Sequence, residues 1–380
     1  MPLPPLSLYI HVPWCVRKCP YCDFNSHEAG AALPEREYVD ALLKDMAQDI
    51  VHVQGRPVST VFIGGGTPSL FSPAAYERLF AGLRELLTFA DDVEVTLEAN
   101  PGTVEQEKFR AYRALGINRL SIGIQSFDPA KLKALGRIHG QDEAIRAAEA
   151  ARLAGFTTFN LDLMHGLPQQ TLPEALLDLQ TAIDLKPTHL SWYQLTLEPN
   201  TVFYRQQPVL PDDETLWAIQ EAGQQLLEKN GYTQYDVSAY AKAGHRCRHN
   251  LNYWEFGDYL AIGAGAHAKI TQANGDILRY WKTRLPRDYL RGLETGRFTA
   301  EEQNIPAGER VFEFMLNALR LREGVAATLF TERTGLDFAD IQQPLSRLQK
   351  QGLMEAGNDV LRCTELGYRH LNRVLTDFLE

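Results

Sequence analysis

The stretch that decides the fold runs from Leu8 to His27 and reads LYIHVPWCVRKCPYCDFNSH. It opens with an apolar, β-branched run, which predicts a strand. It continues with three of the chain's five cysteines, Cys15, Cys19 and Cys22, in the spacing C-x3-C-x2-C. A cysteine cluster of this kind in a reducing compartment more often binds a metal or does redox chemistry than forms disulfides. The sequence therefore predicts a strand that leads directly into a functional loop.

Short strand-like runs alternate with helical patterns through the first half of the chain. The predicted strands are Leu6–Val12, Thr60–Gly66, Val93–Ala99, Arg119–Gln125, Thr158–Met164 and His189–Leu197. The helical patterns between them are Glu35–Val53, Pro73–Leu87, Val104–Leu115, Asp142–Ala154 and Leu172–Leu185. This order predicts βαβ units with a parallel sheet. We therefore expect an α/β fold, a partial (β/α)6 TIM-like barrel rather than a complete eight-stranded one.

The unusual residues of this half come directly after the predicted strands. The cysteines follow the first strand, Gly64–Pro68 follows the second and Glu98–Pro101 follows the third. Gln125 ends the fourth strand and Asp162 lies late in the fifth. Because the carboxyl ends of parallel strands meet at one edge of a sheet, these residues are expected to share one site.

The second half divides into two further predicted domains, 206–300 and 301–380, after a first domain of residues 1–205. Residues 206–300 read as an α+β extension with a helix at Asp212–Asn230, a loop at His245–His267 and a hairpin at Ala268–Trp281 that turns at Asn274-Gly275. Residues 301–380 show helices at Gly308–Arg320, Ala326–Thr334 and Phe338–Gln351 with a two-stranded tail. This order predicts a winged-helix-like module, whose lack of a dense basic stripe favours a covering or partner-binding role.

Composition excludes several classes of protein. The net charge is −10 and the pI about 5.6, which argues against nonspecific nucleic-acid binding and against docking on an anionic membrane. No apolar run approaches the roughly 18 residues of a membrane span. The first residues, MPLPPLSLYIHVP, lack the features of a signal peptide. We therefore expect a cytoplasmic protein.

Four interpretations of the cysteine loop compete. Three thiolates can hold a [4Fe-4S] cluster and leave one iron uncapped, which is an opening for another ligand. A zinc ion could instead recruit His11 or His27, although structural zinc loops usually come as two separated pairs. Cys19 and Cys22 could form a redox dithiol, and the three cysteines could be unrelated. The spacing and position favour the four-iron cluster.

The cysteine loop, with Tyr21 before its last cysteine, resembles the radical S-adenosylmethionine (SAM) superfamily, and Gly64-Gly65-Gly66-Thr67-Pro68 matches its glycine-rich element. The resemblance implies that SAM completes the uncapped iron and is cleaved to a 5′-deoxyadenosyl radical. The segments FIGGGTPSL, LEANPGT, RLSIGIQSF, LKALGRIHG, NLDLMHGLPQQT and HNLNYW narrow the match to the branch related to oxygen-independent coproporphyrinogen III oxidase, along nearly the whole chain.

This resemblance implies a role for each matching residue. Cys15, Cys19 and Cys22 would ligate the cluster, and the expected SAM contacts are Tyr9, Tyr21, Gly65, Gly66, Thr67, Glu98, Gln125, Arg137 and Asp162. The last three match positions that hold a second SAM in the oxidase. Plainer roles stay open for some of them: a half-buried strand aromatic for Tyr9, a turn or cap acid for Glu98, and a solvated loop arginine for Arg137.

Two differences favour the heme chaperones of this branch over the oxidase. Phe24 stands where the oxidase signature has a further cysteine, and only eight residues precede Tyr9, too few for the oxidase's covering segment. The expected heme contacts are His249, Asn250, Tyr253 and Trp254 of an HNxxYW element, and Cys247 is an alternative ligand. His267 is a further heme candidate, but a residue aligned near it contacts SAM in the oxidase, so both contacts stay open for it. A bland alternative places His249 and Asn250 as loop caps and both aromatic residues in the core.

Three functions follow as hypotheses. A heme chaperone would carry heme to apoproteins, expected to be respiratory-chain components, without nucleic acid and at most peripherally associated with membranes. An enzyme would use the radical to decarboxylate coproporphyrinogen III, and whether the chain is an enzyme is left open. A third hypothesis keeps the fold only as a scaffold. Of the remaining candidates, His139 and His165 are expected to be structural and Cys363 a small buried residue.

Overall fold

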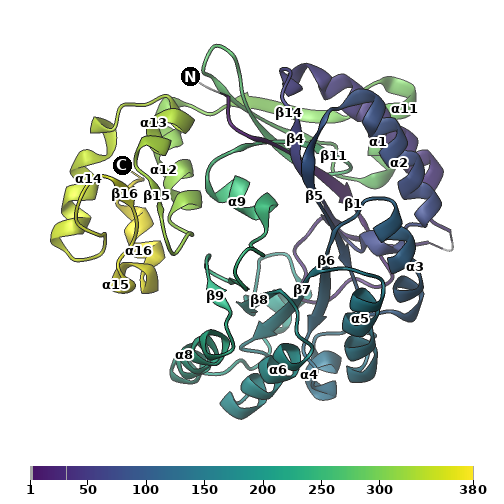
Figure 1. Cartoon of the computed structure of the whole chain (residues 1–380), viewed down its shortest axis with the longest axis horizontal. Coiled ribbons are helices and arrows are strands. Elements are labelled where there is room, and N and C mark those ends of the chain that lie inside the picture. The colour runs from purple at the N-terminus through teal and green to yellow at the C-terminus, as the bar shows by residue number, and fades with distance from the viewer. Residues whose placement is uncertain (1–2, 31, 380) are drawn as a thin grey trace.

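The computed structural model describes residues 3–30 and 32–379 (Figure 1). Its centre is a sheet with the strand order β14-β13-β12-β11-β1-β4-β5-β6-β7-β8-β10-β9. The six predicted strands are neighbours within it and pair in parallel. Their bounds are Leu6–Val12 (β1), Val58–Gly65 (β4), Phe89–Ala99 (β5), Arg119–Gln125 (β6), Thr158–His165 (β7) and His189–Gln194 (β8). The predicted α/β fold with an open parallel sheet, a partial barrel, is confirmed.

The two faces of the parallel sheet differ in polarity, as the alternation of side chains along a strand requires. On β1, Leu6, Leu8, Ile10 and Val12 belong to the main apolar core, whereas Ser7 hydrogen-bonds to Thr60 of β4 on the opposite face (2.7 Å). Helices run along the outside of the curved sheet in Figure 1. They are α1 (Glu35–Asp49), α2 (Pro73–Leu86), α3 (Thr103–Ala114), α4 (Pro129–Ala134), α5 (Gln141–Leu153) and α6 (Leu172–Asp184), with 3-10 turns at Ile50–Val53 and Pro68–Leu70.

The sheet continues into residues 233–304 at both of its edges. Strand β11 (Asp258–Ile262) pairs in parallel with β1, so that Leu260 lies opposite Leu8. Beyond it lie the antiparallel strands β12 (His267–Thr271), β13 (Ile277–Lys282) and β14 (Thr299–Asn304). At the other edge, β10 (Ala239–Ala241) and β9 (Thr233–Gln234) follow β8. The predicted hairpin is confirmed, with Gly275 at φ 88° in its turn.

The prediction of a loop over His245–His267 is wrong. The segment contains helix α9 (Arg248–Trp254) and strand β11, and α9 packs against β1, β4 and β11 on the inner side of the sheet (Figure 1). Both elements are too short to show a clear apolar period, which is why sequence patterns miss them. The predicted helix Asp212–Asn230 is confirmed as α8 (Asp213–Lys229), and the short helices α7 (Val202–Gln206), α10 (Pro286–Leu290) and α11 (Gly292–Thr295) complete this part.

The last part of the chain packs on the sheet extension. Its elements are α12 (Ala307–Ala318), β15 (Val325–Ala326), α13 (Thr328–Thr334), α14 (Ala339–Lys350), β16 (Val360–Leu361), α15 (Glu365–Arg369) and α16 (Leu371–Thr376). Phe314 and Phe330 share a second apolar core with Phe256 and Ile277 of the preceding part. The winged-helix likeness and the two boundaries between the three predicted domains stay predictions. No helix among the described residues has the length and apolarity that a membrane crossing requires.

Candidate functional site

The cysteine loop is closed at its base and braced from within. Residues Trp14–Cys15 (β2) pair in parallel with His27–Glu28 (β3), which brings the two ends of the loop together. The Lys18 ammonium donates to the carbonyls of Phe24 (3.2 Å) and Ser26 (3.1 Å). Other segments hold the loop as well, since the Phe203 amide donates to the Pro20 carbonyl (2.9 Å) and the Asn25 side chain donates to the Ala264 carbonyl (2.9 Å).

A cavity of about 320 Å³ lies between this loop and the carboxyl ends of the parallel strands; we call it the cluster cavity. All three cysteines line it. Eight of the nine predicted SAM-contacting residues line it as well, namely Tyr21, Gly65, Gly66, Thr67, Glu98, Gln125, Arg137 and Asp162. The structure therefore brings the predicted site residues together, although the first and last of them, Cys15 and Asp162, lie 147 positions apart in the sequence (162 − 15 = 147).

The glycine-rich turn after β4 touches the cysteine loop so closely that side chains would not fit. A Cβ on Gly66 would lie 2.5 Å from the carbonyl oxygen of Trp14, and a Cβ on Gly65 would lie 2.6 Å from the His11 ring. Gly65 also has a φ of 118°, in the region that favours glycine. The Thr67 amide donates to the Trp14 carbonyl (2.7 Å), which fixes the turn against the strand that carries Cys15.

Two buried carboxyls give the cluster cavity its electrostatic character. Burial, together with the charge of Asp162, raises the pKa of Glu98 to about 7, and the hydrogen bond from the Gly65 amide (3.1 Å) opposes this only partly. Burial also raises the pKa of Asp162, which accepts hydrogen bonds from Ser121 (2.9 Å) and Asn160 (2.8 Å). A cationic ligand would stabilise both carboxylates, so the residues fit the ammonium and sulfonium groups of SAM.

Arg137 is held on the cavity wall rather than in solvent. Its guanidinium donates to Asn100 (2.8 Å) and to the Gly123 carbonyl, and it lies 3.7 Å from the sulfur of Cys19. The alternative of a solvated loop arginine is therefore wrong. Asn100 in turn donates to Thr67 (2.9 Å), which links the arginine to the glycine-rich turn.

Several lining residues escaped the sequence analysis. Tyr193 at the end of β8 donates to Gln125 (2.8 Å), and Ser121 donates to Asp162 as described above. Each lies on, or just after, a predicted strand that carried no recognised motif residue at that position. The one clue in the sequence was that each is a polar residue on a predicted strand. Sequence patterns alone do not distinguish such a site residue from an ordinary polar residue of a strand.

The three thiols are the donor set expected for a [4Fe-4S] cluster with one uncapped iron. Burial raises the pKa of Cys15 and of Cys22, while hydrogen bonds from Thr67 to Cys15 and from Ser26 to Cys22 lower it in part. Within residues 3–30 and 32–379, no three histidine, cysteine, aspartate or glutamate side chains are arranged to hold one metal ion. Each thiolate would bind one iron of a four-iron cluster, and the adjoining cavity would give room for a ligand of the remaining iron.

A second, larger cavity of about 740 Å³ adjoins the first; we call it the aromatic cavity. Its walls carry many aromatic side chains and several cations, including Trp254, Trp281, Tyr259, Lys269, Arg279 and Arg284. Phe24, two residues after the last cysteine of the loop, lines both cavities. The volume is within the range of about 300–1,000 Å³ that is typical of ligand sites.

The residues predicted to contact heme are divided by the structure. Tyr253, Trp254 and His267 line the aromatic cavity. His249 lies behind Tyr253 and is 1% exposed, and its two ring nitrogens hydrogen-bond to Thr60 (2.8 Å) and to Tyr253 (2.9 Å). Asn250 is not among the lining residues. His249 therefore supports Tyr253 in this arrangement and does not reach the cavity.

Two other candidates also lie away from the expected place. Tyr9, predicted to contact SAM, lines the aromatic cavity and hydrogen-bonds to His11 (2.9 Å), so its SAM contact stays a prediction. Cys247 is buried, and burial raises the pKa of its thiol to about 12, which keeps it protonated at neutral pH. Buried, too, are His139, His165 and Cys363.

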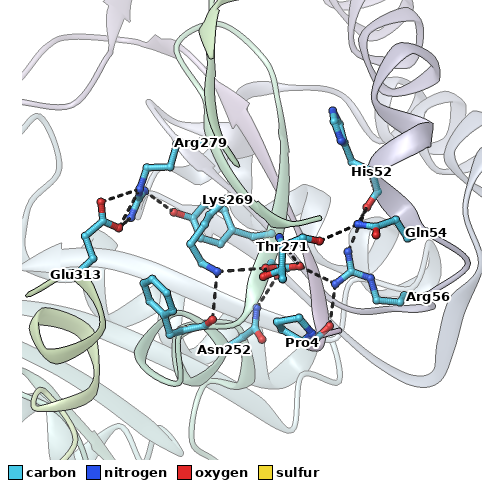
Figure 2. A network of polar contacts seen from close by, with 12 residues as sticks. Pro4, His52, Gln54, Arg56, Asn252, Lys269, Thr271, Arg279 and Glu313 are labelled. Carbon is cyan, nitrogen blue, oxygen red and sulfur yellow. Dashed lines mark hydrogen bonds and ion pairs between the residues drawn. The ribbon is translucent and has the colours of Figure 1, made fainter. Parts of the chain in front are cut away.

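The base of the aromatic cavity rests on a buried ionic network (Figure 2). The carboxylate of Asp258 pairs with Lys269 (3.1 Å) and Arg56 (2.7 Å) and accepts hydrogen bonds from the amide and hydroxyl of Thr271 (both 2.9 Å). Beside it, Arg279 pairs with Glu313 of α12 and donates to Tyr259 (3.3 Å). These contacts fix the two cationic side chains, Lys269 and Arg279, that line the cavity.

Comparison with known proteins gives the family. The Radical SAM superfamily profile matches residues 9–179, and the HemN C-terminal domain profile matches residues 305–370. The chain is 53% identical to "Heme chaperone HemW" of Escherichia coli, over 99% of both chains. It is 34% identical to the protein of that name from Bacillus subtilis, over 98% of this chain and 99% of the relative.

The chain belongs to the HemW family. As a HemW-family member of the radical SAM superfamily, it has a [4Fe-4S] cluster and SAM as its implied cofactors. The solved structure of coproporphyrinogen III oxidase (HemN) from Escherichia coli is similar throughout, with a TM-score of 0.83 and 25% identity over 100% of this chain and 91% of that one. The resemblance seen in the sequence motifs is thus confirmed.

Proposed function

We propose that this protein is a heme chaperone that binds heme in the aromatic cavity and transfers it to apoproteins of the respiratory chain. The observation that carries the proposal is the aromatic cavity of about 740 Å³ that adjoins the cluster cavity in a HemW-family chain. Aromatic walls suit a flat apolar macrocycle, and cations suit its propionates. We place the protein in the cytoplasm, with at most peripheral contact with membrane-bound recipients and none with nucleic acid.

In the cluster cavity we assign the cluster to Cys15, Cys19 and Cys22. When bound there, the cluster would supply SAM with the electron of radical chemistry. The chain's own residues would bind and orient SAM: the glycine-rich turn by close backbone approach, and Glu98 by accepting hydrogen bonds. Tyr21, Gln125, Arg137 and Asp162 complete the assigned wall, with Tyr9 placed behind it. The buried walls would exclude water from this step.

The division of labour between the predicted domains follows from this assignment. Residues 1–205 would hold the cluster and SAM, and residues 206–300 would provide most of the heme wall through Tyr253, Trp254 and His267. Residues 301–380 would cover the cavity base, since Glu313 of α12 pairs with Arg279. Recognition of a recipient apoprotein is assigned to this last part.

Two measurements on anaerobically reconstituted protein test the proposal. Titration with hemin is expected to give a saturable Soret band at a 1:1 ratio, and an apo-cytochrome added afterwards is expected to gain the heme. Trp281→Ala, which removes an aromatic wall of the cavity, should weaken hemin binding, whereas Trp217→Ala on the exposed face of α8 should not. Absence of saturable hemin binding by the unmodified protein would refute the proposal.

A second candidate function is favoured by the similarity to coproporphyrinogen III oxidase along the full chain. That enzyme activity would convert propionates of coproporphyrinogen III to vinyl groups: for each, the deoxyadenosyl radical would take one hydrogen atom, carbon dioxide would leave, and one electron would pass to an external acceptor. Incubating the reconstituted protein with SAM, a reductant, an added one-electron acceptor and coproporphyrinogen III decides between the two. We expect no protoporphyrinogen, and its formation would show that the chain is an enzyme.

A further inference from the structure

His267 occupies a distinctive position in the aromatic cavity. It is the first residue of β12 and an exposed one, and its ring stacks on Trp281 of β13, with ring centroids 5.8 Å apart and planes 18° apart. The cross-strand pairing of His267 with Trp281 fixes this contact through the backbone. The imidazole is therefore held at the cavity wall by a rigid hairpin rather than by a flexible loop.

The ring nitrogens of His267 have no hydrogen-bond partner among the described residues. His11, which also lines the cavity, is engaged at both nitrogens, by Tyr9 (2.9 Å) and by the Asn25 carbonyl (2.8 Å). His249 is engaged at both as well. Of the three imidazoles in and behind the cavity wall, His267 alone therefore has a nitrogen lone pair that can be used without breaking a contact of the described structure.

The surroundings of His267 also keep the imidazole neutral. Partial burial, followed by the charge of Arg279, lowers the pKa of His267 from its usual value. Only the neutral ring has a nitrogen lone pair for iron, and a histidine with a lowered pKa is neutral at physiological pH. Geometry and protonation state thus favour the same residue.

We propose that His267 is the axial ligand of the iron when heme occupies the aromatic cavity, and that Arg284 binds a propionate. This assignment rests on the proposed heme-chaperone function. Arg284 is exposed at the same cavity, and its guanidinium has no ion pair with any described residue, although its backbone carbonyl accepts from Asn25 (2.8 Å). By contrast, Lys269 and Arg279 are already paired with Asp258 and Glu313.

The test compares ligand-deleted protein with a matched control by absorption and electron paramagnetic resonance spectroscopy. His267→Ala is expected to shift the Soret band, to change the ferric spin-state signal and to weaken hemin binding about tenfold or more. Imidazole added to the buffer should restore the original spectrum. His370→Ala, at an exposed histidine in the C-terminal part, should leave spectrum and affinity unchanged.

A second variant covers the possibility that deletion disturbs the hairpin. His267→Met keeps a side chain of similar size and replaces nitrogen by a thioether, so its spectrum should differ from that of both the parent and His267→Ala. Arg284→Ala should weaken hemin binding without altering the spectrum, whereas Arg287→Ala, outside the cavity, should do neither.

The possible outcomes distinguish a failure of the His267 assignment from a failure of the heme-chaperone proposal on which it rests. If unmodified protein binds no hemin, the heme-chaperone proposal itself fails. If unmodified protein binds hemin and His267→Ala retains the parent spectrum and affinity, His267 is not the ligand and the inference is overturned. The inference is also overturned, in favour of His249, if a folded His249→Gln variant loses the parent heme spectrum while His267→Ala keeps it.

Discussion

At the scale of single residues, burial gives the acids of the cluster cavity an unusual titration range. Glu98 has a pKa of about 7 because burial and the neighbouring Asp162 disfavour its charged form. It is therefore largely protonated below about pH 7 and a carboxylate above it. Since SAM carries a net positive charge, the carboxylate form is the one that attracts it.

We expect the affinity for SAM to rise as the pH rises through about 7, in step with the ionisation of Glu98. Glu98→Gln should remove most of this rise and lower the affinity at pH 8 about tenfold, the effect of losing one charged hydrogen bond. Equilibrium dialysis at pH 6 and pH 8 measures both. Glu77→Gln, on the exposed face of α2, is the control, and an unchanged pH profile in Glu98→Gln would contradict the assignment.

At the scale of elements, the glycine-rich turn after β4 packs directly against the start of the cysteine loop, so the position of one depends on the position of the other. A Cβ at Gly66 would overlap the Trp14 carbonyl at 2.5 Å, so the turn or the cysteine loop must move in any variant with a side chain there. Such a shift displaces the groups expected to hold SAM, and within the apolar core it falls on Trp14 at the edge of the cysteine loop.

Gly66→Ala should therefore bind SAM about tenfold to a hundredfold more weakly, because misplacement by about 1 Å has effects of that order in preorganised sites. Its thermal unfolding should change little by comparison. Gly308→Ala is the matched control, since a Cβ there meets nothing within 4 Å. Full SAM affinity in Gly66→Ala would show that the turn does not carry the ligand.

Strand β11 is held beside β1 by backbone pairing and also by the ion pairs of Asp258, its first residue. Asp258 is fully buried and faces Arg56 and Lys269. Asp258→Ala leaves both cations without their partner, and we expect it to lower the free energy of unfolding by about 3–5 kcal/mol. Asp92→Ala, which breaks the exposed pair with Arg248, should cost less than about 1 kcal/mol. Urea denaturation of the two variants compares them directly, and equal losses would contradict the role of burial.

At the scale of the whole molecule, the C-terminal part shares its core with the sheet extension. Phe314 and Phe330 pack in one apolar cluster with Phe256 and Ile277, and Glu313 holds Arg279 at the cavity base. A chain ended after residue 304 would expose this surface and lose the ion pair. We expect it to aggregate or to unfold without a cooperative transition, and to bind hemin poorly.

Calorimetry and hemin titration of the shortened chain check this expectation. The control is Arg322→Ala, which breaks an ion pair with Glu365 within the C-terminal part and leaves the shared core in place. A shortened chain that unfolds cooperatively and binds hemin like the parent would instead show that the retained part folds and binds heme without residues 305–380.

The sequence by itself determined the parallel order of the fold and the composition of the cluster cavity. Strand and helix periods depend on local backbone geometry, and residues after parallel strands must meet at one edge. The cysteines, Gly66 and Glu98 could therefore be placed together from their positions along the chain alone. The HNxxYW element was also visible, but not which of its side chains would reach a cavity.

Only the tertiary structure decided the aromatic cavity. The sequence showed no strand at β11. It also offered no reason to place Trp281 and Arg279 in the same cavity wall as Phe24, because these residues lie more than 250 positions apart along the chain (279 − 24 = 255). It likewise could not reveal that His249 is engaged at both nitrogens while the His267 ring has no hydrogen-bond partner in the described part of the chain. Hydrogen-bond satisfaction is set by neighbours in space, and long-range packing alone selects those neighbours.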